Sequence, residues 1–185
     1  MDTEIVPLSR LKLNARNPRT ISDKKFGLLV DSILTFPKML SIRPLVVTDG
    51  LAILGGNMRY RALIVISQMT GDEIEARLKK IKKYQNLTDG EQFDLLDYWE
   101  KFLTIPSAEV IMAEQLTQEE LDEFVIKDNV GFGDWNLDEL ANEWNDTDLE
   151  AWGLDIPNFD IEEPKDKPPK ESDPSHECPN CGHIW

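Results

Sequence analysis

The sequence predicts an α+β domain over residues 1–157, in which helices flank a small mixed sheet. Three observations lead to this fold class. Short β-rich runs alternate with longer segments of helical periodicity, and an Asp-Gly pair separates two of the runs. After Pro157 the chain becomes polar and rich in proline, which cannot supply a core. With 185 residues, of which 41% are hydrophobic, the chain suffices for one domain and a tail.

Four segments open the domain. Residues 4–8 read as a strand, and residues 11–19 read as a loop because Asn17-Pro18 favours a turn. Ser22 is a fitting N-cap for a helix over 23–35, where apolar residues recur at i, i+3, i+4 and i+7 until Phe36-Pro37 ends it. Two strands follow over 42–48 and 51–54, joined as a hairpin by Asp49-Gly50.

Helices dominate the next part of the chain. Asn57 is expected to cap a helix over 58–69, and residues 72–84 and 90–103 carry two further helical patterns. Residues 108–113 read as a strand. Thr117 and Glu120 match a capping box, which predicts a helix with Leu121, Phe124 and Val125 turned inward.

An acidic segment and a tail complete the sequence. Residues 134–154 are expected to form an acidic, tryptophan-bearing helical segment, with helical spacing from Leu137 to Trp144. Trp135, Trp144 and Trp152 are expected to be core residues rather than part of a cofactor site. Residues 158–175 are expected to form a disordered linker, and residues 176–185 a short cysteine-bearing tail.

Composition and charge exclude several classes of protein. No apolar stretch approaches the roughly 18 residues of a membrane span, and the acidic start has no signal-peptide core, so we expect a cytoplasmic protein without a membrane partner. Two cysteines are too few for a disulfide-stapled scaffold.

The charge is distributed unevenly along the chain. Residues 1–90 hold 15 basic and 9 acidic side chains, whereas residues 91–185 hold 5 basic and 26 acidic side chains. Any nucleotide or DNA is therefore expected on the N-terminal half. The acidic half either adds solubility, docks a basic partner or screens the basic half.

Gly55 and Gly56 end a strand and open a helix, an arrangement suited to an anion. Glycine lets a ligand approach the backbone, and the N–H groups of the first helical turn point at it. Arg59 and Arg61 follow within a turn and a half, where guanidinium groups clamp phosphate. The alternatives are a plain chain reversal at the glycines, a surface ion pair for Arg59 and a structural or rim position for Arg61.

Four motifs recur here in the order and spacing of one family. They are Asn17-Pro18-Arg19, a helix through Ser32-Ile33, the run Pro44-Leu45-Val46-Val47, and Gly56-Asn57-Met58-Arg59-Tyr60-Arg61-Ala62. Over residues 5–66 the chain thus resembles the N-terminal domain of the ParB/sulfiredoxin superfamily. The resemblance implies that fold and a nucleoside triphosphate, CTP or ATP, bound with magnesium.

The resemblance also implies which residues bind. Gly55, Gly56, Asn57 and Arg59 would line the phosphate site, and Asn17 and Arg19 would face it from the loop. Asp128-Asn129 would stand for the family's glutamate-asparagine pair, which helps to hold metal and triphosphate.

Several positions depart from the family pattern. The signature loop lacks its glutamate and first arginine, and Phe132 replaces an expected arginine, which argues against a full CTP switch. Asn57 stands where sulfiredoxins carry a nucleophilic cysteine, so a sulfinic-acid reductase is not expected. The helix-turn-helix domain with which partition proteins read DNA is not visible after this region. Residues 70–104 read as a helical insertion. The segment after residue 130 resembles the corresponding segment of phage and mobile-element proteins.

These features favour a ParB-like nucleotide-binding protein that acts in DNA partition, modification or packaging of a phage or mobile element. Whether it also hydrolyses the nucleotide is left open. A homodimer is one option for such a protein. The first alternative is a non-enzymatic adaptor whose acidic, tryptophan-bearing segment docks a DNA methyltransferase or packaging protein. The second is a small-molecule kinase on the same fold. No clustered carboxylates or histidines indicate catalytic residues, which stay unknown.

The tail carries half of a zinc ribbon. Cys178 and Cys181 present two thiolates across a Cys-x-x-Cys-Gly turn, flanked by His176 and His183. Because zinc needs four ligands, three arrangements are open. Two chains could share a four-thiolate site, one chain could use both thiolates with one or both histidines, or a partner could complete a half-site. A redox dithiol is the remaining reading.

Overall fold

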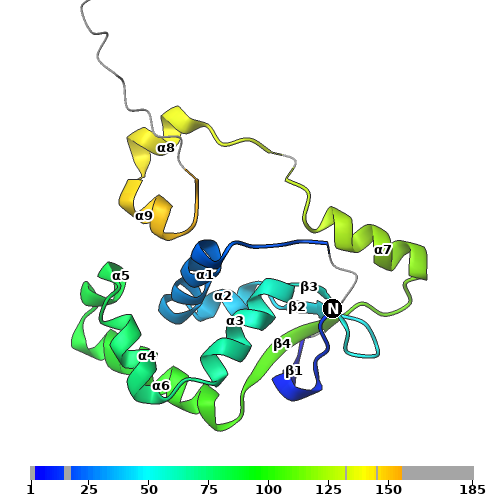
Figure 1. Ribbon diagram of the computed structural model, residues 1–185, viewed down its shortest axis with the longest axis horizontal. Helices are drawn as coiled ribbons and strands as arrows, with labels where there is room; N and C mark the ends of the chain where they lie inside the picture. Colours follow the sequence, from blue (N-terminus) through cyan, green and yellow to red (C-terminus); the bar gives the residue numbers. More distant parts are fainter. Residues whose placement is uncertain (1–2, 15–17, 132, 145, 156–185) are drawn as a thin grey trace, which may run out of the picture. The chain divides into compact units, whose positions relative to one another are not determined.

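The structure is a computed structural model that describes residues 3–14, 18–131, 133–144 and 146–155 (Figure 1). Its sheet has four strands in the order β1-β4-β2-β3. The strands are β1 (Thr3–Pro7), β2 (Leu45–Val47), β3 (Ile53–Gly55) and β4 (Ser107–Met112). β4 pairs antiparallel with β1 and parallel with β2, and β2 and β3 form an antiparallel hairpin. The sheet is therefore mixed, and the α+β class predicted from the sequence is confirmed.

Nine helices accompany the sheet in the part of the chain that is described, together with a 3₁₀ turn at Leu8–Arg10. They are α1 (Asp23–Thr35), α2 (Lys38–Ile42), α3 (Asn57–Ser67), α4 (Gly71–Leu78), α5 (Lys82–Gln85), α6 (Asp89–Thr104), α7 (Gln118–Lys127), α8 (Leu137–Glu143) and α9 (Asp146–Ala151). None of the described helices is long and apolar enough to cross a membrane.

Side-chain caps explain where several helices begin. The Ser22 hydroxyl accepts from the Lys25 N–H, and α1 starts and ends at the residues that the sequence predicts. α4, α6 and α7 each begin with a Thr-x-x-Glu capping box, in which threonine and glutamate satisfy each other's backbone N–H groups. The capping box predicted at Thr117 and Glu120 is confirmed.

The core packs residues of the sheet against residues of α1 and α3. Val47 and Val110 of the sheet, with Leu34 of α1 and Leu63 and Ile66 of α3, are completely or almost completely buried. Ile74, Leu78 and Trp99 extend the same cluster into α4 and α6. The Trp99 indole N–H donates to the Leu34 carbonyl at 3.0 Å, which satisfies its polar group inside the core.

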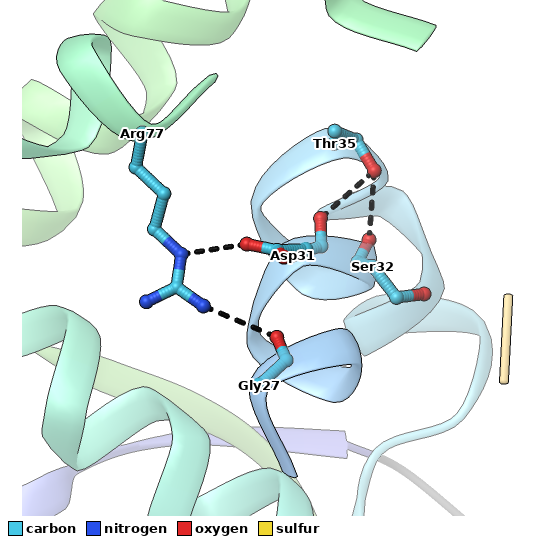
Figure 2. A network of polar contacts seen from close by, with 5 residues as sticks. All are labelled: Gly27, Asp31, Ser32, Thr35 and Arg77. Carbon is cyan, nitrogen blue, oxygen red and sulfur yellow. Dashed lines mark hydrogen bonds and ion pairs between the residues drawn. The ribbon is translucent and has the colours of Figure 1, made fainter. Parts of the chain in front are cut away.

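A half-buried polar contact also fastens α4 to α1. The Arg77 Nε donates to the Asp31 carboxylate at 2.6 Å, and its Nη2 donates to the Gly27 carbonyl at 3.1 Å (Figure 2). Asp31 and Gly27 lie one helical turn apart, so one guanidinium spans two positions on the same face of α1.

Two predictions about elements were wrong, and one helix was not predicted. The helix expected over 72–84 is broken, because Ile81 is extended (φ −96°, ψ 120°) between α4 and α5 and Tyr84 turns into the core. α2 was not predicted. Asn57 is not the N-cap of α3: that position is Gly56, and the Asn57 side chain is buried.

The tryptophans of the acidic segment are not core residues, contrary to the prediction. Trp135, Trp144 and Trp152 are 66%, 52% and 50% exposed. α8 and α9 are short helices of seven and six residues, and Leu149 of α9 is buried. The predicted linker over 158–175 and the tail over 176–185 lie outside the described residues.

Candidate functional site

A cavity of about 750 Å³ lies where the starts of α1 and α3 meet the end of α7. It collects residues from six parts of the chain: the segment before α1, α1 itself, α2 with Arg43, the start of α3, the end of α7, and Trp152 with Gly153. Six residues singled out in the sequence line it: Arg19, Gly56, Asn57, Arg59, Asp128 and Asn129. Asn17 lies outside the described residues.

Gly56 forms the floor of the cavity at the start of α3. Its backbone is left-handed (φ +92°, ψ 19°), a conformation that glycine adopts without strain. A Cβ there would lie 2.6 Å from Leu45 Cδ2 and 3.0 Å from Arg59 Nη2. Among the described residues no side chain caps the first turn of α3, so its N–H groups can face an anion in the cavity.

Gly55 acts behind the cavity rather than in its lining. It is buried, and a Cβ on it would lie 3.1 Å from Asp128 Oδ2 and 3.3 Å from Phe124 Cε1. The missing side chain therefore lets the end of α7 lie against the end of β3, which places Asp128 beside the first turn of α3.

Arg59 supplies a partly desolvated positive charge. Its Nη1 donates to the Pro44 carbonyl at 3.3 Å. Burial lowers the pKa of the guanidinium to about 10, the positive charge of Arg43 acts in the same direction, and Asp128 opposes both. Arg59 is still a cation at neutral pH, and a bound anion would offset the cost of its burial.

Arg19 and Asn129 connect the loop before α1 to the end of α7. Arg19 Nη1 donates to Asn129 Oδ1 at 2.6 Å, across 110 positions of sequence. Asn129 Nδ2 donates in turn to the Val125 carbonyl at 2.7 Å, which fixes the amide on the last turn of α7. The resemblance implied that these two residues share a site, and both line the cavity.

Asn57 lines the cavity, but both ends of its amide serve the fold. The side chain is 5% exposed. Its Nδ2 donates to the Ile53 carbonyl at 3.2 Å, and its Oδ1 accepts from the Asn14 N–H at 3.3 Å. The residue therefore ties the start of α3 to β3 and to the N-terminal loop.

Asp128 is the carboxylate of the cavity lining. Among the described residues, no group of three or more His, Cys, Asp or Glu side chains could hold a metal ion by itself. A lone carboxylate suits Mg²⁺, which commonly binds one or two carboxylates together with substrate phosphates. The predicted zinc ligands Cys178, Cys181, His176 and His183 lie outside the described residues.

Among the cavity residues that were not singled out for this site in the sequence, three are charged or aromatic. Lys25 and Arg43 add two positive charges, and Trp152 adds an aromatic ring. Lys25 lies in the first turn of a helix that the sequence does predict, so it could have been considered. Nothing local indicates that Trp152 reaches the cavity. Arg61 points elsewhere: its guanidinium lies over the Phe26 ring, 5.2 Å from the centroid.

Comparisons with known proteins add little to this geometry. No protein-family model matches the chain, and no curated protein matches it. Among solved structures it is similar to the C-terminally truncated chromosome-partitioning protein ParB from Caulobacter crescentus, complexed with CTP-gamma-S. The two chains are 17% identical, and the match covers 82% of this chain and 71% of the other, with a TM-score of 0.46.

Proposed function

We propose that this protein binds a nucleoside triphosphate in the cavity, with the phosphates against the start of α3 and Arg59. The observation that carries the proposal is that Arg19, Arg59 and Asn129 line one cavity together with the start of α3, which no side chain of the described residues caps. Guanidinium groups and helical N–H groups are the donors that phosphate prefers.

The charge of the lining supports the same ligand. Among the described residues of the lining, the four cations Arg19, Lys25, Arg43 and Arg59 stand against the carboxylate of Asp128, and Lys25 is also paired with Asp155. This positive lining stands out in a chain whose net charge is −15. A polyphosphate with Mg²⁺ would satisfy both signs, because Asp128 could share the ion with the phosphates.

The sequence resemblance to the ParB/sulfiredoxin superfamily makes CTP and ATP the first nucleotides to test. It also suggests the setting of the proposed function: DNA partition, modification or packaging for a phage or mobile element, with DNA on the basic N-terminal half. Domain boundaries at 157 and 175, and zinc in the tail, are further parts of this proposal.

Calorimetric titration of the full chain with CTP and with ATP, each with magnesium, tests the site. Binding is expected for at least one nucleotide, and Arg59→Ala is expected to weaken it at least tenfold, since it removes a charge-assisted contact. Arg61→Ala is the matched control, because Arg61 lies two positions away on the same helix but lies over Phe26. Binding by Arg59→Ala as tight as by the unaltered protein would refute this placement of the phosphates.

A second function is favoured by the exposed tryptophans of the acidic segment. Trp135, Trp144 and Trp152 are each at least half exposed, and large exposed aromatics surrounded by carboxylates suit a basic protein partner. In this alternative the protein is an adaptor for a DNA methyltransferase or packaging protein and binds no nucleotide. Absence of binding to CTP and ATP, with and without DNA, would favour it.

A further inference from the structure

The lining of the cavity contains more than a polyphosphate needs. Besides the cations, it includes apolar side chains from α1, α2 and α3, among them Leu28, Leu40 and Met58, and the indole of Trp152. Phosphate groups gain nothing from apolar contacts, whereas a planar heterocycle does. The composition of the lining therefore indicates a ligand with both a polyanionic and an apolar part.

Trp152 is available for such a contact. Its side chain is 50% exposed although it lines the cavity. It meets Trp144 edge to face, with centroids 6.2 Å apart and an interplanar angle of 83°. An edge-to-face pair leaves at least one face of each ring free of the other ring, so an indole face remains for a second planar group.

The backbone around Trp152 is anchored on both sides. Leu149, three residues earlier, is 6% exposed. Asp155, three residues later, forms an ion pair with Lys25, which itself lines the cavity. Gly153 between them is left-handed (φ +93°), which turns the chain directly after the tryptophan.

We propose that Trp152 is the stacking platform for the base of the bound nucleotide. The inference rests on the proposed function and deepens it, because it explains why the cavity takes a nucleotide rather than inorganic polyphosphate. Every base offers a π face, so stacking on Trp152 contributes to the affinity for CTP and for ATP alike.

The test compares ligands with and without a base. CTP, ATP and inorganic tripolyphosphate, each with magnesium, are titrated into the unaltered chain and into Trp152→Ala, Trp152→Phe and Trp135→Ala. Trp152→Ala is expected to lose about tenfold in affinity for the nucleotides, because the stacking of one base is lost, and less than twofold for tripolyphosphate, which has no base. Trp152→Phe keeps a ring and most of the affinity. Trp135→Ala is the matched control, because Trp135 is 66% exposed and is absent from the cavity lining.

Tryptophan fluorescence gives a second readout that does not depend on the alanine variant folding. Addition of nucleotide should quench emission from the unaltered chain and from Trp135→Ala, and the quenching should be lost in Trp152→Phe. Nucleotide affinity unchanged in Trp152→Ala, or an equal loss for tripolyphosphate, would overturn the stacking role while leaving the phosphate site in place. If neither nucleotides nor tripolyphosphate bind the unaltered chain, the proposed function fails and the stacking role fails with it.

Discussion

Replacing Gly56 by alanine should both destabilise the fold and damage the cavity. A residue with a Cβ at φ +92° carries a strain of about 1–2 kcal/mol. The new methyl group would also lie 2.6 Å from Leu45 Cδ2, and Leu45 is 2% exposed and has little space to move. Overpacking of this kind costs about 1–3 kcal/mol. The two costs together lower the free energy of unfolding by about 2–5 kcal/mol, or the melting temperature by about 4–20 °C.

Urea denaturation followed by circular dichroism measures this loss, with Gly27→Ala as the control. Gly27 lies inside α1, and a Cβ on it would meet no atom within 4 Å. Alanine there should stabilise the protein by about 0.5–1 kcal/mol, because glycine is a poor helix former. A Gly56→Ala protein as stable as the unaltered chain would refute the reasoning about this turn. In the same variant the methyl group crowds the Arg59 guanidinium, 3.0 Å away, so nucleotide binding should weaken as well.

Three further predictions concern contacts that hold the domain together. Arg77→Ala should lower the free energy of unfolding, measured by urea denaturation, by about 1 kcal/mol. A double-mutant cycle with Asp31→Ala should show a favourable coupling energy, because these half-buried groups bond directly. Hydrogen bonds from the N-cap threonines lower the pKa values of Glu91 and Glu120. Both carboxylates therefore stabilise the fold fully at pH values above their ordinary pKa of 4.5. This stabilisation is lost as the pH falls through the lower pKa of the folded state. The variant with glutamine at both positions should therefore be less stable than the unaltered chain at pH 7, and the difference in urea midpoint should narrow below pH 4.5. Asn57→Ala should cost about 1–3 kcal/mol, visible as a lower melting temperature, because it leaves a strand carbonyl and a loop N–H without this partner; no change would show that both groups find other partners.

Local features of the fold were predictable because their causes lie within a few residues. Ser22 and Phe36-Pro37 bound α1 through a cap and a helix stop. Thr117 and Glu120 begin α7 for the same kind of reason. The hairpin of β2 and β3 follows from an Asp-Gly turn between two apolar runs.

The predictions that were wrong concern features that long-range packing decides. The sequence around Ile81 favours one continuous helix, but the chain extends there and Tyr84 is buried in the core. Trp144 and Trp152 have the spacing of core residues, yet they pair with each other and stay half exposed. Helical periodicity shows which residues share a face and not whether that face is covered.

Backbone preferences and neighbours within one helical turn fix the α+β class, the bounds of α1 and the glycine turn at the start of α3, so these features could be predicted from the sequence. Long-range packing, in contrast, places β4 between β1 and β2 and brings Arg19 to Asn129 across 110 positions. It alone placed Trp152 on the cavity and buried the Asn57 amide. Contacts of this kind depend on how buried surfaces fit together, and no local pattern encodes them.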